Sequence, residues 1–529
     1  MRKFYPVAIA LLGCVVGALL VLTFDKLSAR KPVKAGGADW RKVNLILDYV
    51  DANYVDTIDY DGVTEAAVKA ALAKLDPHSV YMPPAVLEEA ETDLSGQFEG
   101  IGIQFNVPND TAIVLEVIPG GPSEKIGLQP GDRILKVDST VIAGVKFPQD
   151  SMVRRMKGPA GTKVLITVFR EGDTIPFEIT RGKIPTHSVD AAFMVSDSVA
   201  YIRVSKFSRT TYKEFATAGL KLAAQGMKEM IVDLRGNSGG FFDQALNMGN
   251  LFLKKGECIV YLEGRKRARE EYKADGSGLF KDIRLKVLID DGSASSSEIF
   301  AGAIQDNDRG LIVGRRSFGK GLVQEPVYFT DGSGVRITVA RFYTPSGRCI
   351  QKPYADDYAY DIFKRYQDGE MVEADSIKVD RSHEYHTAGG RVVYGGGGIV
   401  PDVFVPIDTT KVSRFYIDCN RKATAMRFAS AWFDGHKAEL QSISDYAALT
   451  RYLDSAGLER QFLSFAAAKD GLRPSSTREW ESEKDYMMSS VRALVGRYSK
   501  LGDDAFYHLY LSVDNVFDVA MDACIIQQK

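Results

Sequence analysis

The sequence is poor in the residues that most often build metal sites, disulfide frameworks and histidine-dependent active sites. It has five cysteines and six histidines in 529 residues. The cysteines are scattered and form no C-x-x-C pair, which argues against a structural zinc site and against a dense disulfide framework. His383 and His386 form an H-x-x-H pair in an expected loop, which we interpret as exposed loop residues. We therefore expect no metal and no cofactor.

The chain also lacks a charge surplus and the G-x-S-x-G elbow of many serine hydrolases. Lysine and arginine total 67 against 69 aspartate and glutamate residues, for a net charge of −2. This balance gives no reason to expect nucleic acid as a partner. The length and a hydrophobic content of 45% are typical of a globular protein with two to four domains.

One long apolar run stands at the N-terminus, from Val7 to Phe24, behind Arg2 and Lys3. At 1.5 Å per helical residue it spans about 27 Å, close to the thickness of a bilayer core. A cleaved signal peptide and an uncleaved signal anchor both fit residues 1–30. The length of the run and the lack of a clean A-x-A site favour the anchor. We expect an exported, membrane-anchored protein with its body in the periplasm or otherwise outside the cytoplasm.

The rest of the chain divides into four parts by the periodicity of its apolar residues. Residues 31–95 begin with a short spacer and then have helical spacing. Residues 96–182 have short strand patterns, including 100–107, separated by glycine and proline turns. Residues 183–408 alternate strands with helices, and residues 409–529 are again helical.

The alternating part predicts a mixed α/β core with a partly parallel sheet. Its expected strands are 199–204, 229–234 and 286–290, and its expected helices are 212–225 and 296–306. The predicted fold class is therefore α/β, with an inserted mostly-β domain and helical N- and C-terminal regions.

The stretch "SASSSEIF", residues 293–300, places Ser295 where a strand ends and a helix begins. Backbone N–H groups at a helix N-terminus are unpaired and carry partial positive charge. A hydroxyl there can attack a carbonyl while nearby N–H groups stabilise the oxyanion. The alternative interpretation is an ordinary N-cap serine.

A serine nucleophile needs a base, and no histidine lies beside a strand–turn–helix junction. Lys320 is a candidate because glycines flank it on both sides and apolar residues follow it. A buried lysine can be neutral, since burial lowers its pKa. Taken alone, the segment favours a surface lysine in a glycine turn.

Together, these segments resemble the carboxyl-terminal processing peptidases, also called tail-specific proteases. Residues 293–324 resemble the segment that carries the family's serine and lysine, which lie 25 residues apart, and here 320 − 295 = 25. "LDPHSVYM" (75–82), "IVDLRGNSGG" (231–240) and "GGGIVPDV" (396–403) also resemble family segments. The resemblance covers about residues 40–408.

The resemblance implies a serine endopeptidase in which Ser295 forms an acyl-enzyme. Lys320 would be the general base, and Gln324 would orient the lysine without raising its pKa as a carboxylate would. The implied oxyanion donors are the N–H groups of Ser296 and of Gly239, with Gly240 as the alternative to Gly239.

For two charged residues, Asp306 and Arg235, a functional role and a structural role both stay open. Asp306 matches an acidic position in some relatives, and it equally fits an ion pair at a helix C-terminus. Arg235 would either contact the substrate or pair with a nearby acid.

The β-rich part resembles a PDZ domain. Gly100, Ile101, Gly102 and Ile103 match the loop that binds a chain-terminal carboxylate, and the next strand would add the ligand to the sheet edge. We expect Ile101, Ile103 and Phe105 to line the groove, although strand alternation also suits core packing. The implied partners are protein substrates with free C-terminal tails.

Two alternative functions stay open at this point. A non-catalytic binding or scaffold protein could keep the same fold, and a hydrolase could use His187 or His78 instead of lysine. An adaptor or a second copy of the chain could bind the C-terminal helical region, and the membrane would be a partner through the N-terminal segment.

Overall fold

The computed structural model describes residues 41–107, 110–118, 120–170, 172–354, 358–408 and 412–523. The chain forms two compact units, residues 1–71 and 72–529. The apolar run Val7–Phe24 lies outside the described residues, so its predicted role as an anchor is not tested. Within the described ranges, no helix has the length and apolar character needed to cross a membrane.

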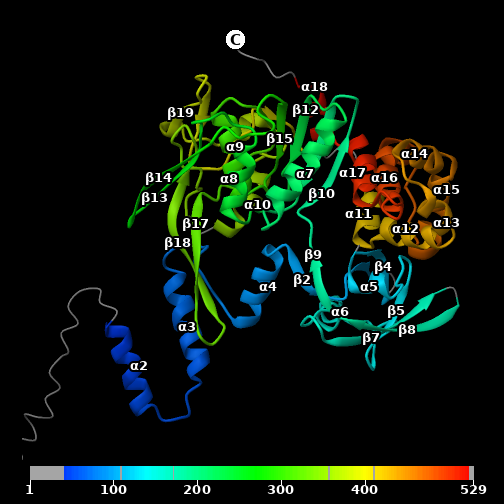
Figure 1. Ribbon diagram of the computed structural model, residues 1–529, viewed down its shortest axis with the longest axis horizontal. Coiled ribbons are helices and arrows are strands. Elements are labelled where there is room, and N and C mark those ends of the chain that lie inside the picture. The colour runs from blue at the N-terminus through cyan, green and yellow to red at the C-terminus, as the bar shows by residue number, and fades with distance from the viewer. Residues whose placement is uncertain are drawn as a thin grey trace, which may run out of the picture. The chain divides into compact units, whose positions relative to one another are not determined.

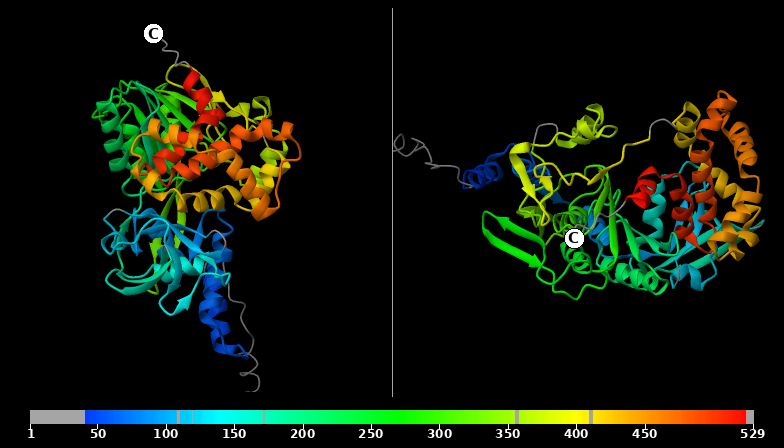
Figure 2. Two further views of the ribbon diagram at one scale, coloured as in Figure 1. Left: turned by 90° about the vertical axis from the view of Figure 1, so that its right-hand side faces the viewer. Right: turned by 90° about the horizontal axis from the view of Figure 1, so that it is seen from above.

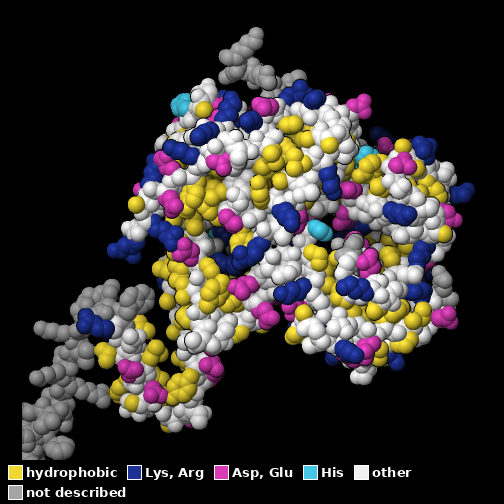
Figure 3. Space-filling view, viewed as in Figure 1, with side chains coloured by type: hydrophobic (Ala, Val, Ile, Leu, Met, Phe, Trp, Pro, Cys, Tyr) yellow, Lys and Arg dark blue, Asp and Glu magenta, His cyan; other side chains and the backbone are white. Residues whose placement is uncertain are grey.

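The described part of the first unit is helical, as its apolar spacing predicts. It contains α2 (Arg41–Asn53) and most of α3 (Tyr60–Leu72). No residue of α2 is buried, and Val43 and Ile46 are both exposed. Figure 3 shows this apolar surface at its lower left. The predicted stripe thus forms a helix face that stays exposed.

The second unit begins with a departure from the predicted helical region. Val80–Met82 form a strand, β1, before α4 (Pro84–Leu94). β1 pairs antiparallel with β18 (Gly334–Tyr343). Strand pairing with a distant segment overrides the local helical pattern here, which sequence spacing alone does not reveal.

The β-rich part is a sheet in the order β3-β4-β5-β7-β8, with β3 at one edge. The predicted strand 100–107 is interrupted, because Gly102 has a φ of +79° between β2 and β3. β2 instead pairs with β9 where the chain enters and leaves this part. The elements are β2 (Gln97–Gly100), β3 (Ile103–Asn106), β4 (Ala112–Val117), α5 (Pro122–Lys125), β5 (Arg133–Val137), β6 (Thr140–Val141), α6 (Gln149–Met156), β7 (Lys163–Arg170), β8 (Asp173–Thr180) and β9 (Gly182–Pro185).

The α/β core contains a six-stranded sheet in the order β10-β11-β12-β15-β16-β21. All neighbouring pairs are parallel except the edge pair β10–β11. The predicted strands and the partly parallel sheet are confirmed. The strands are β10 (Val189–Met194), β11 (Val199–Val204), β12 (Glu229–Asp233), β15 (Arg284–Ile289), β16 (Leu311–Gly314) and β21 (Val403–Phe404).

Three helices cover one face of this sheet: α7 (Thr211–Ala224), α8 (Phe242–Asn250) and α9 (Ser296–Asp306). Their apolar residues share a buried cluster with Ile202 and Val204 of β11. Tyr201, the residue before Ile202, points to the opposite face and belongs to another cluster. This alternation is the side-chain period of a strand.

A second sheet, in the order β1-β18-β13-β14 with β17 beside β18, was not predicted. It matters because Lys320 lies just before β17. The remaining elements of the core are β13 (Cys258–Gly264), β14 (Arg267–Lys273), β17 (Leu322–Tyr328), α10 (Asp361–Gln367), β19 (Glu384–His386) and β20 (Val392–Tyr394).

The C-terminal region is helical, as predicted, and has its own core. Trp480, Met487 and Val491 are buried in it, and the Ser476 side chain caps α16 by accepting the Glu479 N–H at 3.1 Å. Its helices are α11 (Arg414–Arg421), α12 (Thr424–Asp434), α13 (Lys437–Ser442), α14 (Tyr446–Ser455), α15 (Leu458–Phe465), α16 (Thr477–Gly496), α17 (Gly502–Tyr510) and α18 (Asn515–Asp522).

The last helix, α18, leaves that core and covers the second face of the six-stranded sheet. Val516, Phe517 and Ala520 share a buried cluster with Tyr201 and other residues of the sheet. Figures 1 and 2 show the helix, in red, against the green strands. The end of the chain therefore completes the core of the α/β part, and the predicted fold class is confirmed.

This packing predicts that the α/β core depends on α18. Phe517 is buried and its ring meets Tyr201 edge to face. Phe517→Ala should lower the free energy of unfolding by about 3 kcal/mol, because it leaves a cavity under the sheet. Phe363→Ala, at an exposed site, should change it by less than about 0.5 kcal/mol. Denaturant unfolding of both variants measures the difference, and equal effects would contradict this packing.

Candidate active site

Two loops leave neighbouring parallel strands at the same edge of the six-stranded sheet. β12 pairs with β15 in parallel, with Asp233 opposite Leu288. The loop 234–240 follows β12, and the loop 290–295 follows β15. The Ala294 N–H donates to the Asn237 carbonyl at 3.0 Å, which joins the two loops. Ligand sites of α/β sheets form at such carboxyl ends of strands.

The four serines of residues 293–297 have different roles. Three hydroxyls donate to carbonyls of the loop 234–240. Ser293 donates to Leu234 at 2.8 Å, Ser296 to Gly240 at 3.0 Å and Ser297 to Asn237 at 2.8 Å. The Ser295 hydroxyl donates to no described residue. The cluster therefore fastens α9 to the neighbouring loop and leaves the proton of one hydroxyl, that of Ser295, without an acceptor among the described residues.

Ser295 is held in a strained backbone conformation at the start of α9. Its φ and ψ are 55° and −112°, a region that residues other than glycine rarely adopt. Such strain costs about 1–3 kcal/mol and tends to occur at functional sites. The next N–H, that of Ser296, donates to no described residue, as expected for the first position of a helix.

Gly239 lies directly against this serine. A Cβ at position 239 would come within 2.8 Å of the Ser295 Cβ and 3.0 Å of the Ser296 nitrogen, so no larger residue fits. Its own N–H donates to the Asn237 Oδ1 at 2.9 Å. The Gly240 N–H has no acceptor among the described residues. The Gly239 N–H, which was predicted as an oxyanion donor, is therefore already bonded, whereas the Gly240 N–H, which was predicted as its alternative, is free of described acceptors.

Asn237 is a residue that the sequence reasoning missed. Its side chain is fully buried, accepts from Gly239 and donates to the Val204 carbonyl at 2.9 Å. Its carbonyl accepts from Ala294 and Ser297. Its only signal in the sequence is its position, since it is a polar residue between two glycines in the loop that follows a buried strand.

Glu298 was also missed, and it joins the serine segment to the lysine segment. Its fully buried carboxylate accepts the N–H groups of Ser295 at 2.8 Å, Gly319 at 2.7 Å and Lys320 at 2.8 Å. It also accepts the Ser317 hydroxyl at 2.5 Å. Burial raises the pKa of this carboxyl, and the donated hydrogen bonds oppose that rise. The glutamate three residues after an N-cap serine is the signal of a capping box.

Lys320 carries an amine without a partner. Its Nζ forms no hydrogen bond or ion pair with any described residue. Burial lowers the pKa of Lys320, and the nearby Arg336 guanidinium lowers it further. A lysine in this setting is more readily neutral than one at a surface, so it can accept a proton.

Gln324 is not bonded to the lysine in this structure. Its Nε2 donates to the His78 carbonyl at 2.6 Å. The predicted role of Gln324 in orienting the amine therefore stays a prediction, and the observed bond fixes the segment around residue 78 instead.

A cleft of about 940 Å³ brings these groups together. Ser295, Lys320, Gln324, Ser296, Gly239 and Arg336 all line it. No hydrogen bond joins the Ser295 Oγ to the Lys320 Nζ, which are both described. Apolar walls come from Leu87, Leu94, Phe241, Ile299 and Leu322.

The histidines considered above are poorly placed to act as a base. His187 is 68% exposed, with Glu214 at 4.0 Å, and does not line the cleft. His78 does line it, but its ring is bonded to the Tyr358 hydroxyl at 2.6 Å. Burial, with Lys320 nearby, lowers the pKa of His78 to about 4.

Asp306 and Arg235 both form buried ion pairs. Asp306 lies 2.6 Å from Arg348, and both side chains are fully buried, which confirms the ion-pair interpretation. Arg235 pairs with Asp233 and with Asp514. His383 and His386 are exposed, and the described residues contain no group of side chains suited to hold a metal.

The predicted carboxylate loop has free backbone donors. The N–H groups of Ile101 and Gly102 have no acceptor among the described residues, and β3 beside them pairs only with β4. The Ile101 side chain is buried in the core of this part. The expectation that this side chain lines the groove is therefore wrong, and the backbone N–H is the group of Ile101 that is left without an acceptor. Ile103 is partly buried against the same core.

Comparisons with known proteins agree with this architecture. The family model "Peptidase family S41" matches residues 198–360, and the model "PDZ domain" matches residues 100–180. The carboxy-terminal processing protease CtpA of Bacillus subtilis is 33% identical over 349 residues, which is 65% of this chain and 74% of that protein.

Two further matches are also named as proteases. A probable CtpA-like serine protease of Staphylococcus aureus is 33% identical over 60% of this chain and 64% of that protein. A solved structure of a photosystem II D1 C-terminal processing protease is 27% identical, with a TM-score of 0.38. The match covers 69% of this chain and 87% of that one.

Proposed function

The chain belongs to the carboxy-terminal processing proteases of peptidase family S41, and we propose that it cuts peptide bonds with Ser295 and Lys320. That it is a serine peptidase follows from this membership. One observation carries the assignment of residues: a single cleft contains a strained serine, whose hydroxyl proton has no described acceptor, and an unpaired amine of lowered pKa.

Lys320 activates the nucleophile in the proposed reaction. Its neutral Nζ approaches the Ser295 Oγ and accepts the hydroxyl proton as the oxygen attacks the substrate carbonyl. When the tetrahedral intermediate collapses, the ammonium returns this proton to the leaving amine. An acyl-enzyme remains, and Lys320 then activates the water that hydrolyses it.

Backbone donors stabilise the charge that develops on the substrate oxygen. The Ser296 N–H is one donor, supported by its position at the start of α9 and its lack of an acceptor. The Gly240 N–H is free as well, and the Gly239 N–H serves only if its bond to Asn237 breaks. Removing one such donor typically slows catalysis 10²–10³-fold.

The β-rich part captures the substrate. We propose that Gly100, Ile101, Gly102 and Ile103 bind the terminal carboxylate through backbone N–H groups, and that the tail extends the sheet at β3. The unpaired donors and the open edge support this. Holding the tail raises the local concentration of the substrate at the cleft.

The N-terminal segment is proposed to export and anchor the protein. The support is the apolar run Val7–Phe24 of the sequence, whose length matches a bilayer core. An adaptor or second copy bound to the C-terminal helical region also stays a proposal.

The first test removes each reacting group. Ser295→Ala and Lys320→Ala should each lower kcat/KM for casein or a peptide at least about 10⁴-fold, because the nucleophile or its base is lost. Lys500→Ala, at an exposed site, is the control and should keep wild-type activity. Unchanged activity in either active-site variant would refute the assignment, and an inert wild-type chain would favour a binding protein.

The second test concerns the terminal carboxylate. A peptide whose C-terminus is amidated should have a KM about 10–100-fold higher than the free acid, because it loses charge-assisted hydrogen bonds to the loop. Steady-state kinetics on paired peptides with one internal cleavage site give the comparison. Equal KM values for the two peptides would argue against capture by the tail.

The third test uses the pH dependence. Since only neutral Lys320 accepts a proton, kcat/KM should fall as the pH drops through its pKa. Arg336→Gln removes a positive neighbour and should raise that pKa, so the acidic limb should move to higher pH. Arg341→Gln, on the same strand but outside the cleft lining, is the control. A limb that stays in place in Arg336→Gln would contradict this electrostatic effect.

A further inference from the structure

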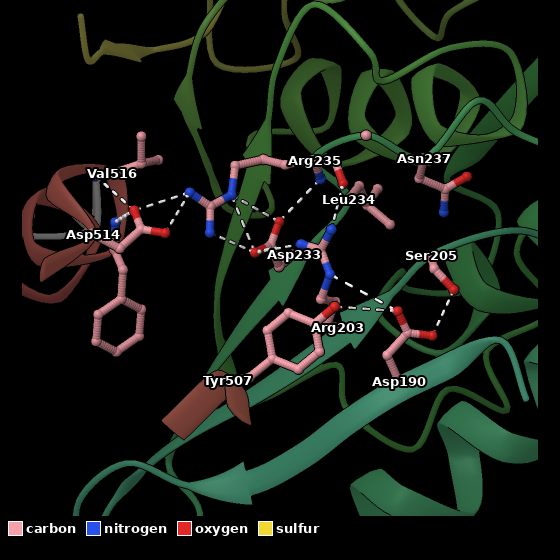
Figure 4. Close-up of polar contacts among 12 residues, drawn as sticks. Asp190, Arg203, Ser205, Asp233, Leu234, Arg235, Asn237, Tyr507, Asp514 and Val516 are labelled. Atoms are coloured by element: carbon pink, nitrogen blue, oxygen red, sulfur yellow. Dashed lines mark hydrogen bonds and ion pairs between the residues drawn. The ribbon is translucent and has the colours of Figure 1, made fainter. Parts of the chain in front are cut away.

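Arg235, at the start of the loop 234–240, is held by carboxylates from two distant parts of the chain. Its Nη2 lies 2.6 Å from the Asp233 Oδ2, at the end of β12. Its Nη1 lies 2.7 Å from the Oδ2 of Asp514, in the C-terminal region, and 2.9 Å from its Oδ1. Figure 4 shows the guanidinium between these two acids.

These groups are withdrawn from water. Asp233 is fully buried, Asp514 is 7% exposed and Arg235 is 16% exposed. Burial raises the pKa of Asp233, but Arg235 and Arg203 together lower it below its usual range. Removing one charge from such a cluster leaves the others without compensation, which moves the side chains that remain.

The backbone of Arg235 is fixed by the same cluster. Its N–H donates to the Asp233 Oδ1 at 2.9 Å, and its carbonyl accepts from the Arg203 Nη2 at 3.1 Å. Two residues later the Asn237 carbonyl accepts the Ala294 N–H, next to Ser295. A continuous set of contacts therefore runs from Asp514 to the strained serine.

We infer that Asp514 is a positioning residue of the active site. It holds Arg235, and Arg235 holds the loop 234–240 so that its backbone donors face the oxygen of the carbonyl group that Ser295 attacks. The inference rests on the proposed function of that loop. It assigns the C-terminal helical region a part in catalysis, beside its packing against the sheet.

Asp514 also has a structural role that the experiment must separate. Its Oδ1 accepts the N–H groups of Val516 and Phe517, both at 3.0 Å, and so caps α18. Asparagine caps a helix about as well as aspartate. Asp514→Asn therefore keeps the cap and removes the charge that faces Arg235.

The experiment compares kcat, KM and thermal unfolding of the full-length protein on a free-acid peptide. Asp514→Asn should lower kcat roughly tenfold, because displaced donors stabilise the oxyanion less well. KM should change less than about twofold, since the carboxylate loop is untouched. Asp445→Asn is the matched control, because Asp445 caps α14 by accepting the Ala448 N–H at 2.8 Å and forms no ion pair with a described residue.

A second comparison keeps the inference testable if Asp514→Asn also lowers stability. If Asp514 acts through Arg235, the double variant Arg235→Gln/Asp514→Asn should have the kcat of Arg235→Gln alone. A further tenfold loss in the double variant would overturn the inference. So would a wild-type kcat in Asp514→Asn, and in that case an inactive Ser295→Ala would leave the proposed function standing.

Discussion

The site depends on one buried carboxylate, that of Glu298. Ser295 begins a helix after β15, whereas Lys320 precedes a strand of the other sheet, so neither sheet alone fixes their separation. Glu298 accepts backbone donors from both segments, and no other described side chain does so. Because it bonds to backbone atoms, it positions the two segments and leaves the hydroxyl and the amine free.

On the other side of Ser295, hydrogen bonds likewise fix the loop 234–240 and leave the reacting groups free. Three of the serines before and in α9 bind carbonyls of the loop 234–240, and Asn237 closes the loop from within. The loop is fixed at its start by Arg235 and its two acids. Hydrogen bonds commit the polar side chains of Ser293, Ser296, Ser297, Asn237 and Glu298, which allows the reacting groups to be unpaired without loosening the structure.

Local patterns predicted three of the six strands of the partly parallel sheet, β11, β12 and β15, and the start of α9, because buried strands and a capped helix leave strong signals over a few residues. Family resemblance singled out Ser295 and Lys320. The partners of Glu298 could not be predicted, since its capping-box pattern says nothing about residues 317–320. Asp514 lies 279 residues from Arg235, and no periodicity connects them.

The departures from prediction have a common cause. Val80–Met82 pair with a strand more than 250 residues away, the Ile101 side chain turns into a core that its neighbours complete, and the Gly239 N–H finds a side-chain acceptor two residues earlier. In each case a specific contact decides the conformation, and this contact is tertiary in the first two cases and local in the third. The strained Ser295 follows the same rule, since a φ of 55° persists only because bonds on both sides of the residue determine it. The strain at the nucleophile therefore depends on the hydrogen bonds that fix the loop 234–240 on one side and the Ser295 N–H to Glu298 on the other.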